Sequence, residues 1–279
     1  MKKISRRSFM AAAAVSVAAL ALTACGGSAS TASSAAASSV AASSEAASTS
    51  AAAELTTVEA GKLTMATNAA FPPYEMTTDA GEFEGIDIDT AKAIAEKLGL
   101  ELQIDDMDFD AALLSVQQGK ADIVMAGVTV TDERKAVMDF SDSYATGIQS
   151  IIVPNDSDIA SPDDLAGKTI GTQRGTTGYI YCSDDFGDEN VVAYDDGLTA
   201  VQALNNGQVD AVVIDNAPAQ EFVAANPGLK VLDTSYAEED YAIGMAKGSA
   251  LEDAVNKALE ELKADGTLQA IVDKYINAN

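Results

Sequence analysis

The 279-residue sequence contains no histidine and no tryptophan, and it has only two cysteines. The absence of histidine excludes histidine-based catalytic triads and removes the commonest protein ligand of transition metals. Two cysteines are too few for a disulfide framework. After Cys25, no apolar run approaches the 18 or more residues that span a bilayer. We therefore expect neither a metal centre nor a bound cofactor.

Basic residues are also scarce, because 17 Lys and Arg stand against 43 Asp and Glu, for a net charge of −26. Such an acidic chain is a poor partner for nucleic acid and does not attach to membranes by electrostatic attraction. The charge does not by itself identify a cationic ligand, since most acidic side chains are expected on solvated faces.

The first feature that is present is a segment typical of a secretory signal peptide, at residues 1–24. Four basic residues precede an apolar stretch, residues 9–24, that holds no acidic residue. Residues 22–25, LTAC, resemble the lipobox of bacterial lipoproteins. This resemblance implies that Cys25 is diacylated and becomes the mature N-terminus. Two acyl chains are enough to anchor a protein stably to a membrane. The alternative is a secreted protein with an incidental cysteine. SRRSF at residues 5–9 also resembles a twin-arginine signal, so Sec and Tat export both stay open.

Residues 25–54 form the expected tether, because the segment after Cys25 is almost entirely Ala, Ser and Thr. Such a tract cannot bury enough apolar surface to offset its ordering entropy. About 30 flexible residues span roughly 30 Å, enough to hold a domain clear of a membrane. We expect an extracytoplasmic protein that is anchored to the outer face of the membrane through lipidated Cys25 and by no other contact.

From residue 62 onward, strands and helices alternate, which predicts an α/β fold. Strands are expected at residues 62–67, 100–104, 122–125, 169–172 and 211–214. Helices are expected at residues 89–98, 111–118, 198–205, 251–263 and 267–276, and the sequence SPDD at residues 161–164 is typical of a helix start. Residues 112–124 and 200–212 share one pattern of helix, Gly stop, Asp and apolar strand, which favours two lobes built from the same unit.

Six motifs occur in an order that resembles the polar amino-acid-binding proteins of ABC importers, a periplasmic-binding-protein-like family. The motifs are ATNAAFPPYE at residues 66–75, GIDID at 85–89, AGVTVTDER at 126–134, DFS at 139–141, QRGTTG at 173–178 and DNAP at 215–218. The resemblance covers residues 61–276.

The resemblance implies a two-lobed clam-shell with two crossovers between the lobes. Lobe 1 is expected at residues 55–150 plus 241–279, and lobe 2 at residues 151–240. A ligand would bind in the cleft and be trapped by hinge closure. The implied partners are a free amino acid and the permease subunits of an ABC transporter, and the protein is expected to be a monomer.

A free amino acid carries a carboxylate and an ammonium on one carbon, so its site needs a paired cation and anion. Arg134 is the candidate for the carboxylate, because a guanidinium donates two parallel hydrogen bonds. Asp215, just past an apolar strand, is the candidate for the ammonium. The alternatives are a surface ion pair for Arg134 and a helix N-cap for Asp215, which could also do both jobs.

The assignment of further residues to the site depends more heavily on the resemblance to the family. Gly127 and Thr129 could complete the shell of the ammonium with a carbonyl and a hydroxyl. Thr177, opening a helix, could offer its hydroxyl and backbone N–H to the carboxylate. Phe71 and Phe109 match positions whose rings sandwich the ligand side chain in the family, although both could equally be core aromatics.

Asn68 and Gln173 match positions that contact the tip of the ligand side chain. Many relatives carry Asp at the first position and Lys at the second, so this chain lacks both a negative and a positive partner there. By subtraction, we expect a polar neutral amino acid such as glutamine, held by amide hydrogen bonds. An arginine- or lysine-type ligand is the alternative, and Glu75 could serve it.

Two other classes of function compete with a transport carrier. Some relatives on this fold are dehydratases, and Glu75 or Asp215 could supply acid–base chemistry. No lysine occurs in the proposed cleft motifs, and histidine is absent, so we expect no enzymatic activity. A ligand-sensing module of a receptor is the third class. No expected role is assigned to Cys182, which is predicted to be a free, partly buried thiol.

Overall fold

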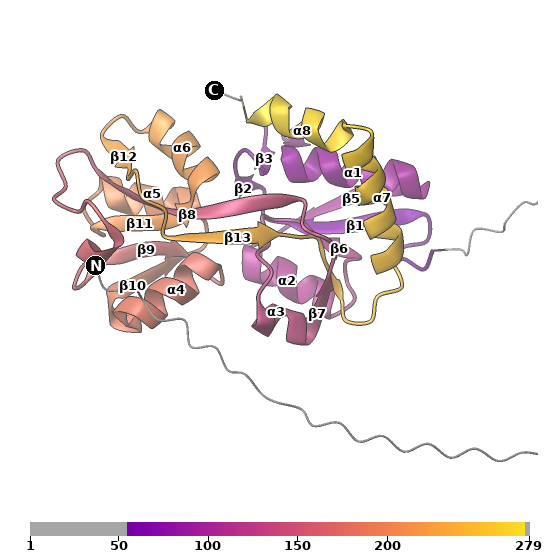
Figure 1. Ribbon diagram of the computed structural model, residues 1–279, viewed down its shortest axis with the longest axis horizontal. Coiled ribbons are helices and arrows are strands. Elements are labelled where there is room, and N and C mark those ends of the chain that lie inside the picture. Colours follow the sequence, from indigo (N-terminus) through magenta and orange to yellow (C-terminus); the bar gives the residue numbers. More distant parts are fainter. Residues whose placement is uncertain (1–54, 277–279) are drawn as a thin grey trace, which may run out of the picture. The chain divides into compact units, whose positions relative to one another are not determined.

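The computed structural model describes residues 55–276 and shows an α/β fold with two main sheets, each flanked by helices (Figure 1). The predicted signal peptide, Cys25 and the whole of the predicted tether lie outside the described residues. The predicted α/β class is confirmed. The boundaries of the two lobes stay predictions.

The first sheet has five strands in the order β5-β1-β6-β14-β7. These strands are β1 (Lys62–Thr67), β5 (Glu101–Asp106), β6 (Ile123–Val124), β7 (Met138–Phe140) and β14 (Gly244–Ala246). β1 pairs in parallel with β5 and β6, and all its residues except the first are buried. Burial on both faces is typical of a strand in a parallel sheet that is flanked by helices. β14, which lies between β6 and β7 in this sheet, comes from the C-terminal part of the sequence.

The second sheet has six strands, in the order β10-β9-β11-β8-β12 with β13 also paired to β8. These strands are β8 (Ala145–Pro154), β9 (Ile170–Gln173), β10 (Val191–Tyr194), β11 (Ala211–Asp215), β12 (Leu229–Val231) and β13 (Ala237–Tyr241). β8 and β13 run antiparallel, side by side, along the two connections between the sheets (Figure 1).

Eight α-helices flank the sheets within residues 55–276. They are α1 (Ile86–Leu98), α2 (Phe109–Gln117), α3 (Asp132–Val137), α4 (Thr177–Phe186), α5 (Gly197–Asn205), α6 (Asn216–Ala225), α7 (Glu252–Ala264) and α8 (Thr267–Tyr275). Two 3₁₀ turns, Pro162–Leu165 and Asp188–Asn190, complete the described helical structure. α7 and α8 pack on α1, so the C-terminal part of the chain supports the first sheet.

Helix α1 shows where prediction and structure agree and differ. It ends as predicted at Gly99, which has φ 70° and whose N–H bonds the carbonyls of Ala95 and Glu96. Its start lies three residues earlier than predicted, at Ile86. Gly85 precedes it at φ 133°, where an added Cβ would lie 2.1 Å from the Tyr74 carbonyl oxygen. The helix start is therefore packed tightly against the small sheet β2 (Ala70–Phe71), β3 (Glu75–Thr77) and β4 (Phe83–Glu84).

The internal repeat predicted from the sequence is confirmed as two helix–strand units, α2–β6 and α5–β11. The repeated aspartate makes the same contact in each unit. Asp122 accepts a 2.7 Å hydrogen bond from the backbone N–H of Thr64, and Asp210 accepts a 2.8 Å bond from that of Thr169. Each aspartate thereby joins its own strand to the neighbouring strand of the same sheet.

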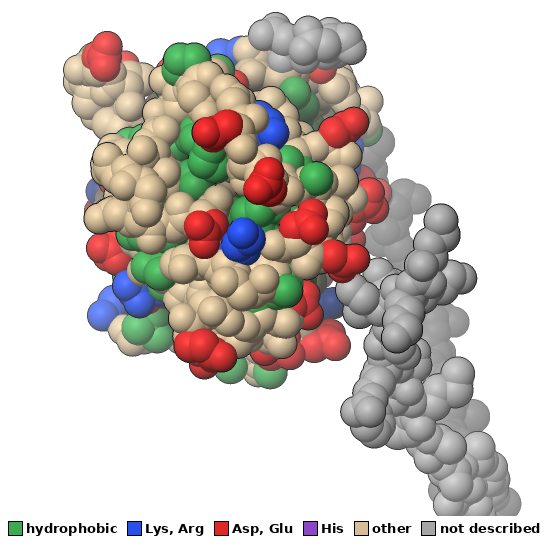
Figure 2. Space-filling model, turned by 90° about the vertical axis from the view of Figure 1, so that its left-hand side faces the viewer, with side chains coloured by type: hydrophobic (Ala, Val, Ile, Leu, Met, Phe, Trp, Pro, Cys, Tyr) green, Lys and Arg blue, Asp and Glu red, His purple; other side chains and the backbone are tan. Residues whose placement is uncertain are grey.

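The surface carries most of the acidic excess. Figure 2 shows Asp and Glu side chains spread over the end of the molecule formed by the second sheet and its helices, with few Lys or Arg side chains among them. Cys182 is a free thiol that is fully buried in the core of that sheet, rather than partly buried as predicted. None of the helices between residues 55 and 276 has the length and apolar character of a membrane crossing. Nor do those residues contain a cluster of acidic, Cys or His side chains suited to a metal ion.

Candidate functional site

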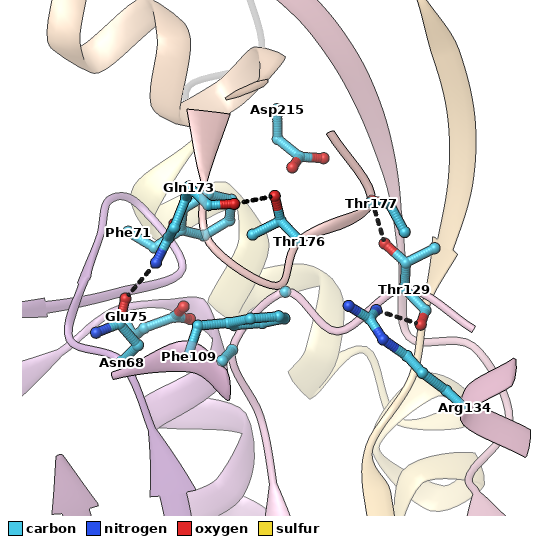
Figure 3. Close-up of a pocket in the computed structure, with 12 residues that line it drawn as sticks. Asn68, Phe71, Glu75, Phe109, Thr129, Arg134, Gln173, Thr176, Thr177 and Asp215 are labelled. Atoms are coloured by element: carbon cyan, nitrogen blue, oxygen red, sulfur yellow. Dashed lines mark hydrogen bonds between the residues drawn. The ribbon is translucent and has the colours of Figure 1, made fainter. Parts of the chain in front are cut away.

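All nine ligand-binding residues predicted from the sequence line one cavity (Figure 3). The cavity lies where strands of both sheets end. Its lining residues are Asn68, Phe71, Glu75, Phe109, Ala126, Gly127, Thr129, Arg134, Gln173, Thr176, Thr177 and Asp215. Charged and polar side chains converge on this cavity, which suits a small polar molecule.

Arg134 projects from the short helix α3, whose N-cap Thr131 accepts a hydrogen bond from the Arg134 backbone N–H. Arg134 is 9% exposed, and its guanidinium donates to the carbonyl oxygens of Thr129 (2.7 Å) and Gly175 (3.1 Å). Its Cζ lies 5.4 Å from the centroid of the Phe109 ring. Burial lowers the pKa of Arg134. A guanidinium has five N–H donors, so the two carbonyls hold it in place and leave donors for an anion.

The alternative of a surface ion pair for Arg134 is wrong. The side chain is buried, and among residues 55–276 no carboxylate oxygen lies within 4.0 Å of a guanidinium nitrogen of Arg134. A buried guanidinium with only neutral partners is energetically costly unless an anion joins it. This environment suits a site for the carboxylate of a ligand.

Asp215 is the last residue of β11 and is 8% exposed. Its carboxylate accepts hydrogen bonds from the Gln149 side-chain amide (2.8 Å) and from the Tyr241 hydroxyl. Asp215 also occupies the N-cap position of α6, as the alternative predicted, but its side chain makes no capping hydrogen bond. Burial raises the pKa of Asp215 to about 7, the charge of Glu239 adds to the rise, and the hydrogen bonds oppose it.

Gly127 is held by a buried carboxylate beneath the cavity. Asp87 accepts hydrogen bonds from the Gly127 N–H (3.0 Å) and the Tyr144 hydroxyl (2.8 Å). Burial raises the pKa of Asp87 to about 6, although these two bonds oppose the shift. Gly127 has φ 55°, and a Cβ there would lie 2.8 Å from the ring of Phe71. The chain therefore needs glycine where the backbone passes the cavity.

Two threonines face the cavity from different sheets. Thr129 follows β6, and Thr177 is the first residue of α4, whose N-cap is Thr176. Both hydroxyls donate to one oxygen of Glu239, at 3.1 Å from Thr129 and 2.9 Å from Thr177. A hydroxyl that donates to Glu239 has only its lone pairs left for a ligand.

The aromatic residues come from separate elements. Phe71 lies in β2 and stacks on Tyr74, with ring centroids 5.9 Å apart, while Phe109 begins α2 and lies beside Arg134. Both rings are largely buried and both line the cavity (Figure 3). They can serve a ligand side chain and the core at once.

The two amide side chains predicted to contact the tip of a ligand side chain bond each other. Gln173 Nε2 donates to Asn68 Oδ1 at 2.8 Å (Figure 3) and to the carbonyl of Asp195 at 3.3 Å. Asn68 Nδ2 donates to the carbonyl of Met107 at 3.0 Å. Part of the hydrogen-bonding capacity of both amides is thereby used within the protein.

Glu75 is a fully buried residue whose side chain lines the cavity. Its carboxyl oxygens accept no hydrogen bond from an N–H or O–H group of the other described residues, and in its protonated form Glu75 donates a hydrogen bond to Asp87. Burial, followed by the charge of Asp87, raises the pKa of Glu75 well above its usual range. The sequence indicated Glu75 only as a contact for an arginine- or lysine-type ligand or as an acid–base group of a competing enzyme.

Glu239 is a residue of the site that the sequence analysis did not identify. It lies in β13, is 6% exposed and also accepts a 3.0 Å hydrogen bond from the Gln149 amide. Its neighbours Glu238 and Asp240 are exposed. Because Glu238, Glu239 and Asp240 are all acidic, no pattern in the sequence distinguishes Glu239 from its exposed neighbours.

Two mixed sheets joined by two strands, with a buried polar cavity at their ends, define the class of two-lobed binding proteins. Residues 63–278 match the family described as bacterial extracellular solute-binding proteins, family 3. The chain belongs to this family of solute-binding proteins, whose members act outside the cytoplasm.

Several relatives support this membership. The L-cystine-binding protein TcyJ of Escherichia coli is 32% identical over 225 residues, covering 79% of this chain and 85% of the relative. The arginine-binding extracellular protein ArtP of Bacillus subtilis is 34% identical over 224 residues, covering 77% and 86%. The structure of the arginine-, lysine-, histidine-binding protein ArtJ from Geobacillus stearothermophilus is similar with a TM-score of 0.75 and 34% identity, covering 78% of this chain and 96% of that one.

Proposed function

We propose that this protein captures a free L-amino acid outside the cytoplasm and delivers it to the permease of an ABC transporter. The observation that carries the proposal is the pairing of Arg134 with Asp215 on one cavity. Both side chains are buried, so each gains a counter-charge when an amino acid places its carboxylate by Arg134 and its ammonium by Asp215.

The division of the site between two sheets supports capture by closure. Arg134 and Thr129 belong to segments that follow strands of the first sheet, whereas Thr177 and Asp215 belong to the second. A ligand that contacts both groups stabilises the arrangement in which they face each other. We infer that the lobes, residues 55–150 plus 241–279 and residues 151–240, close around it.

The ligand that the geometry favours is a basic amino acid such as arginine. The buried carboxyl of Glu75 lines the cavity beside Asp87 and accepts no hydrogen bond from an N–H or O–H group of the other described residues. A guanidinium at the tip of a ligand would supply such donors, and its charge would favour the ionised form of Glu75. Several relatives carry the name of arginine-binding proteins, which agrees with this assignment.

Glutamine, which the sequence analysis favoured, is the second candidate. Asn68 and Gln173 provide neutral amides, and an ancestral arginine-binding protein that is 42% identical, with a TM-score of 0.74 and coverage of 77% of this chain and 98% of that one, has been solved bound to glutamine. Because the side-chain amides of Asn68 and Gln173 bond each other, fewer of their donors and acceptors are free to bind the side-chain amide of a glutamine ligand.

The protein is proposed to act as a monomeric lipoprotein, attached to the membrane through Cys25 and the tether of residues 25–54. No catalytic role is proposed for the raised-pKa carboxyls of the cavity. A dehydratase would consume its substrate, whereas a carrier returns its ligand unchanged, so recovery of the bound compound after release distinguishes the two.

A thermal-shift screen of the full chain against the twenty amino acids tests the proposal. A ligand present at about 100 times its Kd adds roughly 2.7 kcal/mol to the free energy of unfolding. We expect the largest shift with arginine, and its loss in Arg134→Ala and Asp215→Ala. Arg174→Ala is the matched control, because that side chain is 53% exposed and lies outside the cavity. The absence of a shift with every amino acid would contradict the proposal.

A further inference from the structure

Glu239 occupies an unusual position, because it places a buried carboxylate on one of the two strands that connect the sheets. β13 carries Glu239 and pairs with β8, opposite Gly147. The strand alternation turns Glu239 toward the interior and leaves Glu238 and Asp240 exposed. An acidic side chain in such a place is costly unless it is well bonded.

One oxygen of Glu239 accepts three hydrogen bonds from three different parts of the molecule. Thr177 Oγ1 donates at 2.9 Å from the start of α4, on the second sheet. Thr129 Oγ1 donates at 3.1 Å from the segment that follows β6 of the first sheet. Gln149 Nε2 donates at 3.0 Å from β8, the partner strand. A carboxylate oxygen is a strong acceptor, so this is a firm point of attachment between the two sheets.

The hydrogen bonds to Glu239 also fix the orientation of the two threonine hydroxyl groups that line the cavity. Their protons point to Glu239, so Thr129 and Thr177 can only accept hydrogen bonds from a molecule in the cavity through their hydroxyls. Acceptors suit an ammonium and not a carboxylate. The backbone N–H of Thr177 and the guanidinium of Arg134 are then the donors on offer to a carboxylate.

We propose that Glu239 is a positioning residue that ties Thr129 to Thr177 and so holds the two sides of the cavity together. Without this carboxylate, the two hydroxyls are 3.5 Å apart and have only each other as a direct link. Loss of Glu239 should favour separation of the sheets and randomise the orientation of both hydroxyls. In such a variant, closure of the two sides of the cavity depends more heavily on a bound ligand.

Single-molecule fluorescence measures the separation of the sheets directly. Dyes are attached to azide-bearing residues at Leu114 and Leu198, two exposed positions on α2 and α5, which avoids the cysteines. In the full chain without added ligand, we expect Glu239→Ala to reduce the population with the short dye separation several-fold. Glu239→Gln keeps an acceptor oxygen and should restore part of it. Glu238→Ala, an exposed neighbour, is the control and should match the parent protein.

The second readout is the lifetime of the bound amino acid. We expect Glu239→Ala to raise the dissociation rate about tenfold and to leave the association rate nearly unchanged, because most changes in affinity within one site arise in dissociation. Thr177→Val removes one of the three bonded partners. Its effect should be less than additive with that of Glu239→Ala, because both changes break the same link.

An unchanged dye separation in Glu239→Ala, or an equal change in Glu238→Ala, would overturn the proposal. If Glu239→Ala proves unstable by circular dichroism, Thr177→Val alone decides, since it should also lower the population with the short separation. The kinetic readout rests on the proposed function, whereas the ligand-free fluorescence does not. Failure of amino-acid binding is therefore distinguishable from failure of the Glu239 link.

Discussion

Gln173 donates a 2.8 Å hydrogen bond from its side-chain amide to Asn68 Oδ1, and this bond joins the end of β9 in the second sheet to the residue that follows β1 in the first. It is another direct link between the sheets, at the opposite end of the cavity from Thr129 and Thr177 (Figure 3). The same side chains can therefore contact a ligand and help to hold the cavity shut.

Gln173→Ala should weaken ligand binding about fivefold, because it removes one neutral hydrogen bond worth about 1 kcal/mol between the two sides. The loss should be similar for arginine and glutamine if the bond acts mainly on closure. Isothermal titration of both ligands checks this, with Arg174→Ala as a neighbouring control. A loss confined to glutamine would show instead that Gln173 acts chiefly by contacting the ligand amide.

Glu75→Gln should separate the two candidate ligands. The change removes the carboxyl that faces the cavity but keeps its size, so arginine binding should fall at least tenfold while glutamine binding changes little. Titration of both amino acids into the parent and variant proteins measures the difference. Equal losses for arginine and glutamine would contradict a direct role of Glu75 in binding a cationic tip.

The pH dependence of binding should follow Asp215. Only its ionised form pairs with an ammonium, and burial raises the pKa of this carboxyl to about 7. Affinity should therefore fall as pH drops from 8 to 5, by up to tenfold per pH unit below the pKa. Titrations across this range test the expectation, and Asp215→Asn should bind weakly at every pH.

The stability of the ligand-free protein should respond to Asp215 with the opposite sign. The folded-state pKa of about 7 exceeds the ordinary value of 3.8, so the folded state holds the proton more tightly than the unfolded state. The free energy of unfolding should fall as pH rises between these two values. Asp215→Asn removes this contribution, and thermal unfolding at pH 5 and pH 8 should show a smaller decrease in the variant.

Gly127→Ala tests the close approach of the backbone to Phe71. Gly119 is the matched control, since it has φ 65° but no atom within 4 Å of an added Cβ. Gly119→Ala should cost about 1–2 kcal/mol from the left-handed backbone alone. Gly127→Ala should cost about 1–3 kcal/mol more, because the methyl group displaces the Phe71 ring. Urea unfolding of both variants measures the difference, and equal costs would contradict the packing argument.

The sequence predicted the architecture well where the signal is local. β1 matches its predicted bounds, residues 62–67, because five consecutive buried positions follow Lys62. The internal repeat was recognisable because the same helix, glycine and aspartate recur. The start of α1 was missed, since Ile86 and Ile88 are buried by packing on the small sheet and not by a periodic pattern alone.

Site residues that belong to a sequence motif could be predicted, whereas residues that join the site through contacts with distant parts of the chain could not. All nine predicted residues meet at one cavity, yet Glu239 was missed. Its three partners lie 62, 90 and 110 residues away along the chain. No local pattern encodes such contacts. The mutual bond of Asn68 and Gln173, 105 residues apart, was likewise invisible to composition and spacing.

The most direct test of the account is a calorimetric comparison of L-arginine with two analogues on the full chain. Agmatine lacks the α-carboxylate that Arg134 is proposed to bind, and Nα-acetyl-L-arginine lacks the charged ammonium that Asp215 is proposed to bind. We predict that L-arginine binds and that each analogue binds at least a hundredfold more weakly. Agmatine or the acetylated compound binding as tightly as L-arginine would contradict the paired recognition of an amino acid by Arg134 and Asp215.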